Sequence, residues 1–189
     1  MFFKIMVLEK RRHFRALLLS TVLLLSSGCS KNDSEDQIST NSESDNMRDE
    51  IVQRNMANVQ IAAEHYCADH EPDKFPTKLD DAFLTYLPGG TENKVPSSTG
   101  QPNPFTGKLE FPIVIPAGSK KFPEFPLIRT PDDVRRLRDG QRFKIGQGVI
   151  VYFALENAAG YAIVGGAHDC YSLIDHLNDG KVLVFSNID

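Results

Sequence analysis

Residues 47–70, MRDEIVQRNMANVQIAAEHYCADH, carry the strongest structural signal in the chain. Their apolar side chains recur at spacings of four and three residues, which places them on one face of an α-helix. The residues on this stripe are Val52, Met56, Val59, Ala63 and Tyr66. Asp45 or Asn46 can cap the start of the helix, and Pro72 ends it. The stretch therefore predicts a long helix with a single face toward a core.

The segment before this helix has a different composition. Residues 30–46 read SKNDSEDQISTNSESDN, in which Ile38 is the only aliphatic residue. Such a segment cannot bury enough apolar surface to offset the entropy lost on ordering. We therefore expect residues 29–46 to form a disordered tether and residues 47–189 to form one globular domain.

The first 28 residues have the pattern of an export signal. Five Lys/Arg precede an apolar run at residues 16–25, which is too short for the roughly 20 residues that span a bilayer. The following Leu25-Ser26-Ser27-Gly28-Cys29 resembles the lipobox of bacterial lipoproteins. This resemblance implies cleavage before Cys29 and a lipid on its sulfur, which would anchor the protein in the cell envelope, facing the periplasm or the exterior. Ser30 after the cysteine favours the outer membrane over the inner one. The alternative is an ordinary secretory signal with an incidental cysteine.

The charge balance narrows the range of partners. The 189-residue chain has a net charge of −4, and its first 28 residues hold five Lys/Arg and one Glu. Their removal leaves 16 basic and 24 acidic residues, a net charge of −8. A chain this acidic argues against nucleic acid as a partner and against a basic membrane-binding face.

The middle of the chain reads as short elements and irregular structure. Residues 79–87 have a short helical pattern that Pro88-Gly89-Gly90 stops. Eight of the eleven prolines lie in residues 96–131. Proline is confined to edges and ends of sheets, so we expect only short edge strands there, at residues 109–111 and 113–115.

The last part of the chain predicts one more helix and then a sheet. Thr130-Pro131-Asp132-Asp133 is typical of a helix start, and Gly140 is the expected end. Strand patterns follow at residues 148–155, 161–164 and 181–186. A long helix, an irregular middle and a carboxy-terminal antiparallel sheet together predict an α+β fold.

Six short motifs occur in a characteristic order. They are NVQIAAEHY (58–66), KFPT (74–77), LPGG (87–90), NPFTG (103–107), YAIVGG (161–166) and VFSN (184–187). In this order they resemble the globular domain of type IV pilins and type II secretion pseudopilins. The resemblance implies a long helix packed on a twisted antiparallel sheet.

The chain also departs from that family. It lacks the continuous apolar helix, the glycine-phenylalanine cleavage site and the early glutamate of a filament subunit. We therefore expect a pilin-like head on a lipid anchor. The resemblance implies a non-enzymatic binding or assembly factor associated with type II secretion or type IV pilus proteins.

Cysteine usage predicts a cross-link. Apart from Cys29, the chain has only Cys67 and Cys170, and two cysteines in an exported protein most simply form one disulfide. The alternative is a zinc site made by these cysteines with His70 and His168.

The resemblance to pseudopilins also raises a calcium site near the last strands. Hard oxygen ligands for such a site are Asp169, Asp175, Asn178 and Asp179. The alternative is that these residues form turns and solubilise the surface. Beyond this candidate calcium ion we expect no cofactor.

Two further features concern binding and catalysis. Arg135, Arg136 and Arg138 form a basic cluster, either the solvated face of a helix or a docking patch for an acidic partner. The proline- and aromatic-rich middle is an alternative groove for a carbohydrate or peptide, unless its aromatic rings only hold the loop on the core. Common motifs for hydrolysis and phosphate binding are absent, so we expect no enzyme. An envelope hydrolase with an unrecognised site ranks third.

Overall fold

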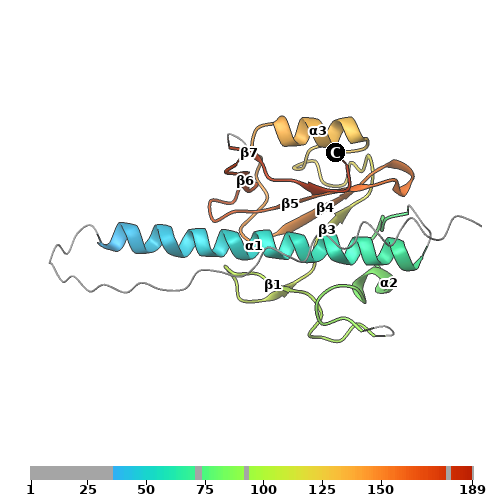
Figure 1. Ribbon diagram of the computed structural model, residues 1–189, viewed down its shortest axis with the longest axis horizontal. Helices are drawn as coiled ribbons and strands as arrows, with labels where there is room; N and C mark the ends of the chain where they lie inside the picture. Colours follow the sequence, from blue (N-terminus) through green and yellow to red (C-terminus); the bar gives the residue numbers. More distant parts are fainter. Residues whose placement is uncertain (1–35, 71–73, 92–93, 178–179, 189) are drawn as a thin grey trace, which may run out of the picture. The chain divides into compact units, whose positions relative to one another are not determined.

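A computed structural model describes most of the chain (Figure 1). The described residues are 36–70, 74–91, 94–177 and 180–188. The expected export signal at residues 1–28 and the expected lipid site at Cys29 lie outside them. The described part combines one long helix with antiparallel and mixed sheets, so the predicted α+β class is confirmed. None of the helices in these ranges is long and apolar enough to cross a membrane.

Helix α1 (Asp36–Asp69) contains the predicted stripe. Val52, Met56 and Val59 are fully buried, as the spacing predicts. The helix begins at Asp36, so residues 36–46 of the expected tether are helical and the predicted start at Met47 is wrong. Once the packed half of a helix has formed, each further residue adds a hydrogen bond without the cost of nucleation.

The main sheet has four strands in the order β3-β4-β5-β8. The strands are β3 (Ile113–Ile115), β4 (Ile150–Ala154), β5 (Tyr161–Gly165) and β8 (Phe185–Ser186). β4 and β8 each lie antiparallel to β5, but β3 lies parallel to β4, with Ile113 opposite Val151. The sheet is therefore mixed, and the proline-rich middle supplies its parallel edge strand.

Shorter elements surround this sheet. They are α2 (Asp81–Leu84), β1 (Gln101–Pro102) paired with β2 (Leu109–Glu110), the 3-10 helix η1 (Glu156–Ala158), and β6 (Ile174–Asp175) paired with β7 (Lys181–Val182). Residues 181–186, predicted as one strand, are thus divided between two sheets. β7 pairs with β6, and β8 pairs with β5.

The two faces of the sheet support separate apolar cores. Successive side chains of a strand point to opposite faces, so Tyr152 joins the core under α1 while Phe153 joins the core on the other side. Helix α3 (Pro131–Asp139) covers this second core through Val134 and Leu137. In Figure 1, α1 and α3 lie on opposite sides of the sheet. Every residue of β4 and β5 is buried, which explains why both strands read as continuous apolar runs.

Buried amides attach the β1–β2 hairpin to α1. Asn55, only 3% exposed, donates from Nδ2 to the carbonyl oxygen of Pro102 at 3.0 Å. Gln101 donates from Nε2 to the carbonyl oxygen of Asn55 at 2.9 Å and accepts from Asn58 at 3.2 Å. Since buried polar groups require partners, these hydrogen bonds determine where the hairpin sits along the helix.

Side chains of α1 lie directly against the backbone of the sheet at Gly165, the last residue of β5. A Cβ atom at this position would lie 2.6 Å from Cγ1 of Val52 and 2.8 Å from Sδ of Met56. Real Cβ contacts are longer than this, so the helix can lie directly on the strand only because residue 165 has no side chain.

We expect Gly165→Ala to destabilise the fold by about 1–3 kcal/mol, because the added methyl overpacks a filled core. A double-mutant cycle with Val52→Ala, measured by urea unfolding, checks the cause. In the Val52→Ala background the added methyl enters vacated space, so Gly165→Ala should cost less there than in the wild type. An equal cost in both backgrounds would contradict the proposed contact.

Candidate docking site beside helix α3

The amino-terminal end of α3 has the predicted capping box. The Oγ1 atom of Thr130 accepts a hydrogen bond from the backbone N–H of Asp133 at 3.4 Å. In return, Oδ2 of Asp133 accepts from the backbone N–H groups of Thr130 at 2.8 Å and Arg129 at 3.0 Å. A cap of this kind contributes about 1 kcal/mol. It also joins the helix to the extended segment before it.

The Asp133 carboxylate remains ionised in this environment. Partial burial raises its pKa, but the ion pair with Arg136 and the hydrogen bonds from Thr130 and Arg129 lower the pKa to about 2. The end of α3 therefore holds a permanent negative charge at neutral pH, with Arg136 paired to it.

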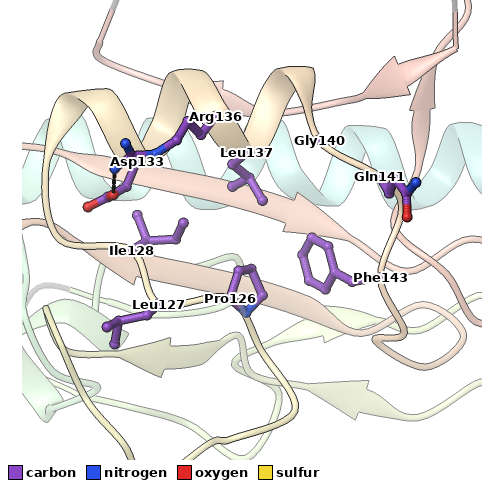
Figure 2. Close-up of a pocket in the computed structure, with 9 residues that line it drawn as sticks. All are labelled: Pro126, Leu127, Ile128, Asp133, Arg136, Leu137, Gly140, Gln141 and Phe143. Carbon is purple, nitrogen blue, oxygen red and sulfur yellow. Dashed lines mark hydrogen bonds and ion pairs between the residues drawn. The ribbon is translucent and has the colours of Figure 1, made fainter.

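A groove of about 250 Å³ lies between α3 and the extended segment that precedes it. Its apolar residues are Pro126, Leu127, Ile128, Leu137 and Phe143, and its polar residues are Asp133, Arg136 and Gln141. Figure 2 shows Pro126, Leu137 and Phe143 around its centre, with Asp133 toward one end and Gln141 at the other. Leu127 is 52% exposed. The groove is thus an open, mainly apolar surface bordered by a few polar groups.

The three arginines predicted to dock a partner have different environments. Arg136 lines the groove, and Arg135 pairs with Asp132 at 2.6 Å on the exposed side of α3. Arg138 instead donates to Oγ of Ser186 and to the carbonyl oxygen of Ile188, both at 2.7 Å. Arg138 therefore holds the carboxy-terminal segment, and only Arg135 and Arg136 remain for docking.

The groove lies in a basic part of an acidic chain. Residues 120–144 contain eight Lys/Arg and four Asp/Glu, a net charge of +4, whereas the rest of the full chain carries −8. Sequence reasoning identified the arginines but missed the apolar groove, since its walls come from residues before, within and after α3. The apolar run from Pro126 to Ile128, just before the helix start, was the available signal.

The aromatic residues of the proline-rich middle mainly serve the core. Phe122 and Phe125 are half-buried and pack against the core under α3, where the ring centroid of Phe125 lies 6.5 Å from that of Phe153. They hold the loop in place, whereas Leu109, Phe111 and Leu127 of the proline-rich middle are exposed.

The described residues do not assemble the predicted calcium site. Asp169 receives two hydrogen bonds from the guanidinium of Arg142, at 2.6 and 2.7 Å, and a third from the backbone of Tyr171. Asp175 accepts from the backbone of Leu177, while Asn178 and Asp179 lie outside the described residues. Within the described ranges, no three His, Cys, Asp or Glu residues form a group that could hold a metal ion.

The predicted Cys67–Cys170 disulfide is wrong for this structure, in which both cysteines are free. The backbone of His168 donates to Oδ1 of Asp49 at 2.8 Å, so the turn that carries Cys170 lies beside Asp49. Cys67 lies 18 residues further along α1, about 27 Å away at 1.5 Å per residue. A disulfide requires Cα atoms within about 7 Å. The same separation rules out the alternative zinc site.

An ion pair joins the turn at His168 to α1. Nδ1 of His168 lies 2.7 Å from Oδ2 of Asp49, in addition to the backbone hydrogen bond. The hydrogen bond to Asp49 raises the pKa of His168, the charges of Asp169 and Asp45 raise it further, and partial burial opposes the shift. Docking of this turn on the helix therefore depends on pH. The sequence gives no local sign of a pair whose members are so far apart in the chain.

Comparisons with known proteins give no match. No protein-family model matches the chain, and neither a curated protein nor a solved structure is significantly similar to it. The features that bear on function are therefore those of the chain itself: the groove beside α3, its basic surroundings and the long helix α1.

We expect two free thiols when the Cys29→Ala chain, exported to an oxidising compartment, is unfolded without reductant and titrated with Ellman's reagent. Cys29→Ala removes the third cysteine, so that only the thiols of Cys67 and Cys170 are counted. A result of zero thiols in the monomer would show that Cys67 and Cys170 meet after all.

The free energy of unfolding should fall as the pH rises from about 6 to 8. A raised pKa in the folded state means that protonated His168 stabilises the fold. This contribution is complete below the ordinary pKa of about 6.5 and is lost as the pH rises through the folded-state value. Urea unfolding across this range should show a smaller decline in His168→Gln. His65→Gln, a change at an exposed histidine of α1, is the control and should leave the decline intact.

Proposed function

We propose that this protein is a lipid-anchored lipoprotein of the bacterial cell envelope. It acts as a non-enzymatic binding or assembly factor for type II secretion or type IV pilus machinery. The lipid on Cys29 holds it to a membrane, and the folded part faces the periplasm or the exterior.

The observation that carries this proposal is the groove beside α3. Its surface is open and mainly apolar, and Leu127 forms an exposed wall. Exposed apolar surface next to charged residues is typical of sites where proteins bind protein segments. A binding role fits this geometry better than the hydrolase alternative, because the polar groups at the groove are the paired Asp133 and Arg136 and the amide of Gln141.

The course of α1 supports an anchored head. Its carboxy-terminal half packs on the sheet, whereas residues 42–50 are exposed or half-buried. The exposed part of the helix is thus the part that follows the Cys29 segment in the sequence. A long helix followed by a sheet is the order of elements in the pilin-like family that the motifs resemble. The parallel strand β3 is a departure from the fully antiparallel sheet that the resemblance implies.

The alternative function is capture of a free extracytoplasmic ligand. One wall of the groove, Pro126 to Ile128, comes from the proline-rich middle, the segment expected to bind a carbohydrate or peptide. The mainly apolar lining favours a peptide over a carbohydrate. The two functions differ in whether the occupant belongs to a resident envelope protein.

Crosslinking in intact cells followed by mass spectrometry tests the proposal. The wild type should capture secretion or pilus components, and Cys29→Ala should lose this capture because the head no longer sits at the membrane. The two chains are compared at equal abundance, checked by immunoblot. Capture of unrelated peptides or glycans by the wild type, with no secretion or pilus component, would favour the alternative.

A further inference from the structure

We propose that the groove beside α3 docks an acidic, amphipathic segment of the partner protein. An apolar side chain of that segment enters the groove while a neighbouring carboxylate pairs with Arg136. This inference rests on the proposed function, since it requires a partner protein, and it adds where that partner binds and what its segment contains.

The apolar half of the recognition comes from the floor and wall of the groove. Ile128 and Leu137 belong to the core under α3 and form a fixed floor. Leu127 is exposed beside them and loses contact with water when a partner side chain covers it. The volume of about 250 Å³ accommodates one large aliphatic or aromatic side chain, but not a folded element.

The charged half comes from Arg136. Its partner Asp133 already accepts three hydrogen bonds, from the backbones of Arg129 and Thr130 and from the hydroxyl of Thr130. All three lie on Oδ2, while Oδ1 of Asp133 is bonded to Arg136. The Arg136 side chain is 74% exposed, and exposed ion pairs between residues three apart are weak. The N–H groups of Arg136 that do not face Asp133 can thus bind a second carboxylate.

The distribution of charge selects an acidic occupant. Residues 120–144 carry a net charge of +4, and the rest of residues 29–189 carries −12. Ion pairs of Arg129 with Glu156 and of Arg142 with Asp169 offset two of the positive charges. An acidic segment is repelled by most of the surface and attracted to this part, which favours the correct encounter and disfavours others. A basic segment would instead be drawn to the remainder of the chain.

The chain offers a matched control for each half of the contact. Leu109, on the β1–β2 hairpin, is 49% exposed and resembles Leu127 in exposure, but it does not line the groove. Arg135 lies on the same helix as Arg136 and has the same kind of ion pair, to Asp132, but it does not line the groove either. The substitutions at the control residues change the composition and the net charge by the same amount as those at Leu127 and Arg136.

The test is selection of a displayed library of random 12-residue peptides on the full lipidated chain in detergent micelles. Selected peptides should combine Asp or Glu with Leu, Ile, Phe or Met. Their affinity should fall at least about tenfold in Leu127→Ser and in Arg136→Glu, and should weaken with added salt. Leu109→Ser and Arg135→Glu should stay within about twofold of the wild type. Circular dichroism and thermal unfolding verify that all four variants are folded.

Several results would overturn the inference: no enriched peptide, enrichment of basic peptides, or an equal loss of affinity in the control variants. Displacement of the peptides by phosphatidylglycerol vesicles would assign the groove to lipid instead. A photo-crosslinking residue placed at position 127 or 109 in cells separates this inference from the proposed function. Capture of secretion or pilus proteins at position 109 alone would contradict docking in the groove but leave the proposed function standing. Capture at neither position would contradict both the docking and the proposed function.

Discussion

Direct contact between α1 and the backbone of β5 at Gly165 is the constraint on which the rest of the structure depends. Because Val52 and Met56 fill the space above this glycine, the helix lies on one face of β4 and β5, where Phe83 of α2 completes the cover over Tyr152. The alternate residues of the same strands then point to the opposite face and need a second cover. Helix α3 and the proline-rich segment provide it. The groove beside α3 is thus a consequence of how the second face of the sheet is closed.

The features that the sequence predicted correctly are those determined by residues close together in the chain. The stripe of α1 and the start of α3 follow from residues only a few positions apart, and both were found as predicted. The position of β3 and the division of residues 181–186 between two sheets were not predictable in this way. They depend on which strands become neighbours, and the pairing of Ile113 with Val151 joins residues far apart in the chain. The early start of α1 at Asp36 has another cause, since a helix already formed on the core gains one hydrogen bond for each added residue and needs no apolar face to continue.

The same division applies to the candidate site. The basic cluster on α3 was visible in the sequence, but the separate roles of Arg136 and Arg138 depend on where the carboxy-terminal segment lies. The disulfide prediction failed because the number of cysteines gives no information on the distance between them. The turn at Cys170 is placed by the contact of His168 with Asp49, and neither residue is adjacent to a cysteine. Long-range contacts of this kind are decided by packing as a whole.

The amino-terminal half of α1 has a mechanical consequence. Between Asn46 and Asp36 the helix extends for about 15 Å as a rod, whereas a disordered chain of the same residues would behave as an entropic spring. A disordered chain would stretch when the folded part moves, whereas a helix transmits both rotation and tension. Load applied to the folded part would therefore pass along the helix axis toward the amino-terminal segment with little loss. The contact of Asp49 with the turn at His168, at the base of the rod, would bear that load first.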